Sequence, residues 1–326
     1  MGNRERNEPP IYIGSMAYQL GEIACDIRKD VQCATGEEQR WLELLIENGM
    51  VHYFKSRHCS LDNAGDVVES VLSQFQCSPD EVDAIIFTSY SYRSAYLHAD
   101  LKKDKLNFSR YINSCLQRKV KLKNATFFGT FLAESGNFVS LLRAARNLIR
   151  AEGKKNVLCV NVDQIPHHPT QRRGALSGVM TNSDVAMAFM VSSEKGDFNL
   201  ESLHQVFNPY LNTLGRGDGL KKQMEIMRGI TDSAASTLNQ ADCKPDDYQY
   251  LIINNYSLNL MQQFASYMGF SSNKLMVENL PKFAHAFTAD NIINLTTIAP
   301  KLTSGDRVFM LSGGTTNWGS CSVQKI

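Results

Sequence analysis

Hydrophobic and polar positions form their most informative pattern between residues 124 and 149. A short apolar and aromatic run bounded by glycines is typical of a buried strand, and its members are Phe127, Phe128, Phe131 and Leu132. From Phe138 to Ile149, apolar residues recur at helical spacing, with arginines on the opposite face. The pattern predicts a strand, a tight turn and a helix, with Glu134, Ser135 and Gly136 in the turn.

Ser135 is the residue in this turn with the most chemical interest. It would lie at the N-terminus of the helix, where unpaired N–H groups and the helix dipole favour negative charge. A side chain there can react or bind an anion. The simpler interpretation is that Ser135 is an ordinary N-cap residue.

Similar units occur along the rest of the chain. Apolar runs predict strands over residues 11–15, 82–88, 156–162, 185–191, 250–254 and 308–311. Amphipathic spacing predicts helices over 62–75, 220–238 and 258–267. Strands that alternate with helices indicate an α/β protein whose mainly parallel sheets are covered by helices.

The chain also contains a diluted internal repeat. The segment 77–91, CSPDEVDAIIFTSYS, matches the segment 243–257, CKPDDYQYLIINNYS. Cysteine, proline, acidic, paired apolar, tyrosine and serine positions recur at a constant offset. A period this long indicates duplication of an α/β half rather than a solenoid.

Composition excludes several classes of function. The 326 residues suffice for one large domain or two closely packed halves, and a hydrophobic content of 43% supports a substantial core. The net charge of +1 gives no overall attraction to nucleic acid. Residues 92–123 are locally basic, as a solvated face or a docking surface for an acidic partner, but few aromatic residues are interleaved for base stacking.

Membrane and export signals are not found in the sequence. No apolar window has the length of a membrane span, and the charged start lacks the apolar core of a secretion signal. The eight cysteines show no CxxC pair or other metal-ligand spacing. We therefore expect reduced thiols in a cytoplasmic protein with no metal site and no membrane partner.

Several segments together resemble one enzyme family. The most specific is GGTTNWGS over residues 313–320, and the others are residues 49–58 and 62–88, the turn at Ser135 and the strand ending at Asp163. They resemble the thiolase-fold enzymes, and more narrowly β-ketoacyl-ACP synthase III and its relatives. The resemblance implies a thiolase fold of two duplicated halves in α-β-α-β-α layers. It places the N-terminal half over 1–170 and the C-terminal half over 171–326.

The sequence departs from this family at the catalytic positions. The family's nucleophilic cysteine corresponds to Ser135, or to Glu134 if the register shifts by one. The family's histidine corresponds to Asn254, and the family's asparagine corresponds to His285. The resemblance therefore implies that Cys–His–Asn is replaced by Ser–Asn–His, as in either a reworked or an inactive site.

The chemistry of these residue types suggests roles. A serine hydroxyl needs a base within hydrogen-bond reach, and His285 is the candidate. Asn254 could then stabilise an oxyanion, with backbone N–H groups at Ser135 and near Gly314 as further donors. Alternatively, His285 is a structural histidine and Asn254 an amide that caps a strand end.

Binding residues follow from the resemblance less directly. Trp41 would take the place of a tryptophan that stacks on the CoA adenine, and Tyr96 that of an aromatic residue sent across a dimer interface. Lys221 and Lys222 could meet a phosphate or an acidic carrier at the pocket mouth, or form a solvated helix face. We expect no tightly bound cofactor, a CoA or phosphopantetheine thioester as substrate, and a homodimer or a heterodimer with a paralogue.

Two functional hypotheses follow. The first is an acyltransferase or atypical condensing enzyme of specialised metabolism, polyketide or fatty-acid-like, that carries an acyl group on Ser135. The second is a non-catalytic partner subunit in a heteromeric complex. An approach of Ser135 and His285 to about 3 Å, which is hydrogen-bond reach, would favour the first.

Overall fold

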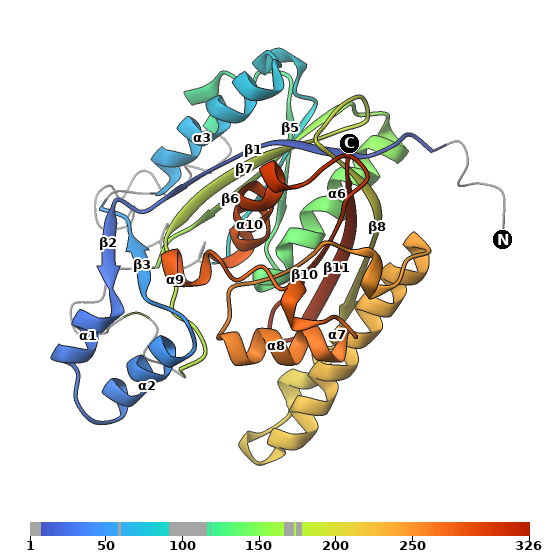
Figure 1. The fold of residues 1–326 in the computed structure, drawn as a ribbon. Helices are drawn as coiled ribbons and strands as arrows, with labels where there is room; N and C mark the ends of the chain where they lie inside the picture. The colour runs from blue at the N-terminus through green and yellow to red at the C-terminus, as the bar shows by residue number, and fades with distance from the viewer. Residues whose placement is uncertain (1–7, 58–59, 91–115, 118, 166–172, 174–177) are drawn as a thin grey trace.

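The framework of the molecule is a mixed sheet of nine strands in the order β5-β4-β6-β7-β1-β8-β11-β10-β9 (Figure 1). The computed structural model describes residues 8–57, 60–90, 116–117, 119–165, 173 and 178–326. The strands of this sheet are Tyr12–Leu20 (β1), Ala84–Thr88 (β4), Thr126–Thr130 (β5), Asn156–Asp163 (β6), Val185–Ser192 (β7), Phe198–Phe207 (β8), Tyr250–Ile253 (β9), Arg307–Gly313 (β10) and Asn317–Lys325 (β11).

Strand pairing divides the sheet into two related halves. In the first half β4 pairs in parallel with β5 and β6, and β7 joins β6 to β1. In the second half β9 pairs in parallel with β10, and β11 joins β10 to β8. The halves meet where Tyr12 and Ile13 of β1 pair with β8.

The internal repeat is visible as matched structure. A short 3-10 turn at Pro79–Glu81 leads into β4, and an equivalent turn at Pro245–Asp247 leads into β9. Strand β7, which ends at Ser192, belongs to the first half because it pairs with β6 and β1. Strand β8, which begins at Phe198, pairs with β11 of the second half. The domain boundary that we expected at residue 170 stays a prediction.

Helices cover both faces of each half, and together they create layers (Figure 1). Helix α3 (Ser60–Phe75) packs on β1, β6 and β7, and helix α7 (Gly219–Ala241) packs on β8 and β11. Helices α6 (Asn137–Glu152) and α10 (Asp290–Ile298) each contact strands of both halves. The order is therefore helix, sheet, helix, sheet, helix, with α6 and α10 in the central layer.

The two faces of strand β7 are buried in two different hydrophobic cores. Successive side chains of a strand point to opposite faces. Met187, Phe189 and Val191 accordingly enter the central core between the halves, and Ala188 and Met190 enter the core beneath α3. Each Phe or Met buried in this way contributes roughly 1.5–3 kcal/mol. Burial on both faces explains why the segment VAMAFMV is continuously apolar.

A smaller unit stands beside the sheet (Figure 1). It consists of β2 (Ile23–Asp26), α1 (Ile27–Cys33), α2 (Gly36–Glu47) and β3 (His52–Lys55), with β2 and β3 paired antiparallel. Helices α8 (Leu258–Tyr267) and α9 (Leu280–Phe283) complete the second half. Among the described residues, no helix combines the length and the apolar character needed to cross a membrane.

One expectation about burial is wrong. The aromatic run before Ser135 was expected to be a buried strand, but β5 is the edge strand of the sheet. Phe128 and Phe131 are about two-fifths exposed, at 40% and 41%, and Leu132 is 93% exposed. Among the residues that the structure describes, only β4 pairs with β5.

Candidate active site

The turn that carries Ser135, called the nucleophile turn below, joins the edge strand β5 to the central helix α6. Ser135 lies in a single 3-10 turn, Glu134–Gly136, between β5 and α6, and is 7% exposed. The carbonyl oxygen of Ser135 accepts a hydrogen bond from Ser312 Oγ at 2.5 Å, and that of Glu134 accepts one from Thr288 Oγ1 at 3.4 Å. Glu134 itself has a φ of +48°, in the left-handed region that non-glycine residues rarely adopt. Hydroxyl groups from the second half thus fix a strained turn of the first.

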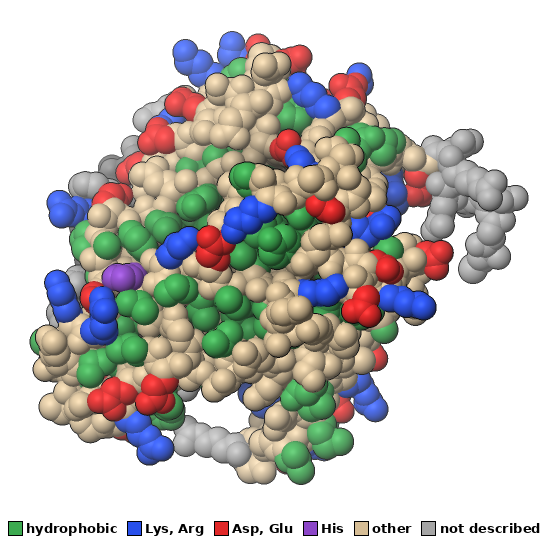
Figure 2. Space-filling model, in the orientation of Figure 1, with side chains coloured by type: hydrophobic (Ala, Val, Ile, Leu, Met, Phe, Trp, Pro, Cys, Tyr) green, Lys and Arg blue, Asp and Glu red, His purple; other side chains and the backbone are tan. Residues whose placement is uncertain are grey.

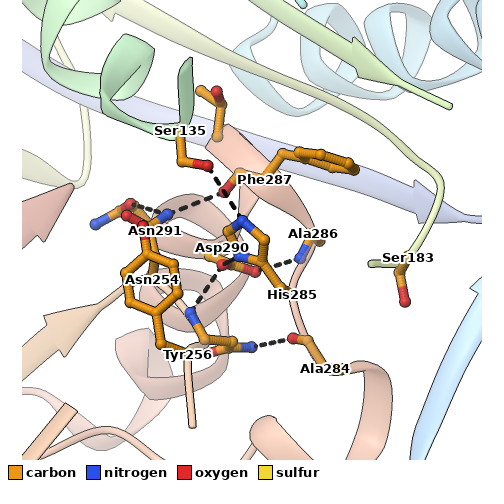
Figure 3. Close-up of polar contacts among 12 residues, drawn as sticks. Ser135, Ser183, Asn254, Tyr256, Ala284, His285, Ala286, Phe287, Asp290 and Asn291 are labelled. Atoms are coloured by element: carbon orange, nitrogen blue, oxygen red, sulfur yellow. Dashed lines mark hydrogen bonds and ion pairs between the residues drawn. The ribbon is translucent and has the colours of Figure 1, made fainter. Parts of the chain in front are cut away.

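His285 belongs to the second half and forms a hydrogen bond with Ser135 in this turn (Figure 3). Its Nε2 lies 3.1 Å from Ser135 Oγ, and its Nδ1 lies 2.5 Å from Oδ2 of Asp290. The carboxylate of Asp290 accepts a hydrogen bond from Nδ1–H, so Nε2 of the neutral ring carries no proton and can accept a hydrogen bond from the serine hydroxyl. Ser135, His285 and Asp290 therefore form a serine–histidine–aspartate relay.

Asp290 is buried and fully hydrogen-bonded. It is 0% exposed, and its carboxylate accepts the backbone N–H groups of Ala286 at 2.7 Å and Asn255 at 2.8 Å as well as the imidazole. Charge-assisted hydrogen bonds of this kind hold both the carboxylate and the ring. We did not select Asp290 from the sequence. The available signal was an aspartate five residues after His285, at the start of a helix.

The backbone around His285 is constrained on both sides. Its N–H donates to Thr181 O at 3.0 Å, and its carbonyl accepts the N–H of Ser183 at 2.8 Å. Ala284 and Phe287 have φ values of +53° and +54°. Strained backbone of this type persists where the surroundings over-determine it, as they do at functional sites.

Two aromatic rings bracket the imidazole. The ring centroids of Tyr256 and Phe287 lie 5.3 Å and 5.4 Å from that of His285. Tyr90 in turn stacks on Phe287 at 5.4 Å. The rings keep water from the base and limit its rotation.

Asn254 lies next to the relay but is committed to the backbone (Figure 3). Its Nδ2 donates to Phe287 O at 3.0 Å and to Asn291 Oδ1 at 3.4 Å, and its Oδ1 accepts the N–H of Gly313 at 3.0 Å. Both amide protons and the oxygen are therefore occupied. This arrangement matches the strand-end amide that we weighed as the alternative, and gives no support to Asn254 as an oxyanion donor.

Glu134 lies in the pocket wall beside Ser135. Its Oε2 accepts the N–H of Thr315 at 2.6 Å and the Thr315 hydroxyl at 2.9 Å. A Cβ at Gly314 would lie 2.6 Å from this oxygen, so the close approach requires glycine. Glu134 and Gly314 thus tie the nucleophile turn to the loop after β10.

A cavity of about 500 Å³ opens onto Ser135 and His285. One part of its wall comes from the segment after β6, with Ile165, Val179 and Met180. Another comes from α7 and α8, with Ile226, Leu260 and Phe264. The wall is predominantly apolar, which suits an acyl chain or the methylene groups of a pantetheine arm.

A buried ion pair secures the segment that carries part of this wall. Arg173 donates to both oxygens of Asp184, at 2.6 and 2.9 Å, and also to the carbonyls of Phe54 and Ile165. Their side chains are 8% and 0% exposed. The pair thus joins β3, the end of β6 and the start of β7 around the site.

The remaining predicted binding residues lie outside this cavity wall. Trp41 is half-buried on α2, and its indole would contact a Cβ placed at Gly178. Lys221 and Lys222 are in the first turn of α7, where the Lys221 ammonium lies 5.1 Å from the centre of the Tyr210 ring. Tyr96 and most of the basic segment 92–123 lie outside the described residues.

The described residues show neither a metal-ligand cluster nor a strongly charged patch on the face in Figure 2. Within the part of the chain that the structure describes, no group of three His, Cys, Asp or Glu side chains could hold a metal ion. Acidic and basic side chains are dispersed over the face in Figure 2, without a patch of one sign. The relay and its apolar cavity are therefore the principal candidate for chemistry.

Comparison with known proteins agrees with the fold. Residues 238–325 match the family model described as 3-oxoacyl-[acyl-carrier-protein (ACP)] synthase III C terminal. No curated protein sequence matches the chain. The solved structures that resemble it include 3-oxoacyl-[acyl-carrier-protein] synthase III from Aquifex aeolicus VF5, with a TM-score of 0.75, 17% identity and coverage of 96% of this chain and 99% of that one.

Two further structures extend the comparison. The acyltransferase ChlB3 has a TM-score of 0.81 and 16% identity, and the match covers 98% of each chain. The priming β-ketosynthase of the R1128 polyketide biosynthetic pathway has a TM-score of 0.75 and 12% identity, over 100% of this chain and 99% of that one. The thiolase-type fold is confirmed, and the chain carries, over residues 238–325, the C-terminal domain of the 3-oxoacyl-ACP synthase III family.

Proposed function

We propose that this protein is an acyltransferase that accepts an acyl group from a CoA or phosphopantetheine thioester onto Ser135. The observation that carries the proposal is the 3.1 Å separation of Ser135 Oγ and His285 Nε2, with Asp290 on the other ring nitrogen. This meets the distance criterion that separates the catalytic hypothesis from the partner-subunit hypothesis. The resemblance to an acyltransferase and to synthase III enzymes supports the choice of thioester chemistry.

The first half-reaction follows from the geometry. Ser135 Oγ forms a bond to the thioester carbonyl carbon while His285 Nε2 takes the hydroxyl proton. The C–S bond then breaks, and the leaving sulfur takes the proton from the imidazolium. The products are an acyl ester on Ser135 and a free thiol.

In the second half-reaction an acceptor replaces the thiol. An alcohol or amine gives its proton to His285 as its oxygen or nitrogen bonds to the acyl carbon. The ester bond breaks, and Ser135 Oγ recovers the proton. Simple transfer to such an acceptor uses the relay twice in the same way, so we favour it over condensation with a malonyl or β-keto thioester.

The direct test is intact-protein mass spectrometry after incubation with a panel of acyl-CoA and acyl-carrier thioesters. We expect an acyl adduct on the wild type that is lost in Ser135→Ala. Ser140→Ala is the matched control, because Ser140 lies in α6, directly after the turn that carries Ser135, but bonds to Gln205. Wild-type protein that stays unmodified with every donor would instead favour a non-catalytic partner subunit.

The start of α7 carries basic and exposed apolar side chains that an acyl donor could contact as it enters the cavity. Lys221 and Lys222 lie in the first turn of this helix, and Leu220 and Met224 in its first two turns are exposed. A basic and apolar surface near the cavity wall of Ile226 would suit an acidic carrier protein or the phosphates of CoA. We propose no tightly bound cofactor, and a role in specialised metabolism as for the polyketide ketosynthase above.

The partner and the compartment are part of the same proposal. The edge strand β5 and the two residues after it, with exposed Phe128, Phe131 and Leu132, are where we place a second copy or a paralogue. The six described cysteines form no disulfide, consistent with a reducing cytoplasm.

A further inference from the structure

Tyr256 stands at the reacting serine without a role in the relay (Figure 3). It follows β9, lines the cavity, and its hydroxyl donates to Gly313 O at 2.6 Å. The Tyr256 ring centroid lies 5.3 Å from that of His285, whose Nε2 is 3.1 Å from Ser135 Oγ, and all three residues line the cavity. A phenol beside the attacking oxygen is also beside the carbonyl oxygen of a substrate, since both oxygens bond to one carbon.

Acyl transfer needs hydrogen-bond donors for the carbonyl oxygen as it becomes negative. Several donors near Ser135 are already used within the protein. Gly313 N–H donates to Asn254 Oδ1, Gly314 N–H donates to Asn317 O, and Thr315 N–H donates to Glu134. These groups cannot turn to the substrate without breaking the loop that ties β10 to the nucleophile turn.

The Tyr256 hydroxyl is different because it can turn without moving the backbone. Its present acceptor is a neutral carbonyl, and an oxyanion is a stronger acceptor. Burial, followed by the negative charges of Asp290 and Glu134, raises the pKa of Tyr256 well above its ordinary range. The phenol therefore keeps its proton and remains a donor.

We propose that Tyr256 is a further catalytic residue, whose phenol hydrogen-bonds to the acyl oxygen in the tetrahedral intermediates on Ser135. The inference rests on the proposed function, since it concerns the same intermediates. As Ser135 Oγ bonds to the carbonyl carbon, the π electrons move to the oxygen and the phenol donates to it without transferring its proton. When the C–S bond breaks, the carbonyl re-forms and the phenol can return to Gly313.

The test is Tyr256→Phe, which keeps the ring beside His285 and removes only the hydroxyl. Acylation of Ser135 is followed as the burst of nitrophenolate from p-nitrophenyl hexanoate and by intact mass. Loss of one oxyanion donor should lower the acylation rate by roughly 10² to 10³, with a KM within about twofold of wild type. Tyr18→Phe, which removes an exposed phenol on β1 away from the cavity, should stay within about threefold of wild type, as expected for a group outside the oxyanion site.

A spectroscopic measurement separates this role from a structural one. In the acyl enzyme made with ¹³C-labelled carbonyl, a hydrogen bond to the acyl oxygen lowers the carbonyl stretching frequency. The band should move to higher frequency in Tyr256→Phe and stay in place in Tyr18→Phe. If Tyr256→Phe does not fold, 3-fluorotyrosine at position 256 keeps the hydroxyl as a stronger donor and should move the band to lower frequency.

The outcomes are distinct. Wild-type burst kinetics in Tyr256→Phe, or an unmoved carbonyl band, would overturn the role of Tyr256 and leave the acyltransferase proposal intact. A wild type that shows no Ser135 adduct with any donor would overturn both.

Discussion

His285 Nδ1 lies 2.5 Å from the carboxylate of Asp290, a residue only five positions further along the chain. The imidazole is in a loop and the carboxylate begins α10, so a turn of backbone closes the contact locally. Both side chains are buried, at 1% and 0% exposed. The pair makes His285 a base of defined tautomer, directed at Ser135.

The first prediction concerns this pair. Asp290→Asn should keep the fold but reverse the hydrogen bond at Nδ1, which leaves Nε2 protonated and unable to accept from Ser135. We expect acylation to fall by roughly 10⁴, as for the equivalent change in serine hydrolases. Asp246→Asn, at an exposed turn, is the control and should acylate at the wild-type rate. Equal rates for both variants would mean that Asp290 has no part in the relay.

The second prediction concerns the buried pair of Arg173 and Asp184. Arg173→Leu would leave a fully buried carboxylate without its cation, so the free energy of unfolding should fall by about 3–5 kcal/mol. Arg28→Leu makes the same change at the solvent-exposed Arg28 of the Arg28–Asp26 pair and should lower the free energy of unfolding far less. Urea titration of both variants measures the contrast. A similar loss in the two would refute the importance that we assign to burial.

A third prediction concerns the contact of α7 with β11. A Cβ at Gly229 would lie 2.0 Å from the Trp318 ring, which is buried and lines the cavity. Gly229→Ala should therefore lower the free energy of unfolding by about 1–3 kcal/mol, as overpacking does. Gly219→Ala, in the same helix but with nothing within 4 Å, should be neutral or stabilising by up to about 1 kcal/mol. Thermal unfolding of the two variants and the wild type measures these changes in stability, and equal midpoints for the two variants would contradict the prediction.

The fourth prediction concerns assembly. Phe128→Lys places a charge on the edge strand β5, where a partner strand would have to bury it. If β5 is the interface, light scattering should show a wild-type dimer and a monomeric Phe128→Lys. Phe207→Lys is the matched control, because Phe207 is also exposed but belongs to β8. A dimer that survives Phe128→Lys would place the interface elsewhere.

The sequence allowed much of the framework to be predicted. Buried strands such as β7 were found because burial on both faces leaves an unbroken apolar run. The unit around Ser135 was found because its helix is strongly amphipathic. Both signals are local and depend on spacing alone.

The features that were missed depend on contacts between distant segments. Asp290 resembles the acidic residue that begins many helices, and only its approach to His285 reveals its role. The exposure of Phe128 depends on which strand lies at the edge of the sheet, and the order of the strands cannot be predicted from the local spacing of apolar residues. Tyr256 cannot be told from an ordinary aromatic residue until the fold places Gly313 and His285 beside it.

Ser135 and His285 are 150 positions apart and come from opposite halves of the duplicated fold. A chain in which each half had folded but the two had not yet docked would hold a serine without its base. Reactivity of Ser135 therefore reports docking of the halves rather than formation of either. During refolding, labelling by a fluorophosphonate would time that event, separately from the appearance of secondary structure.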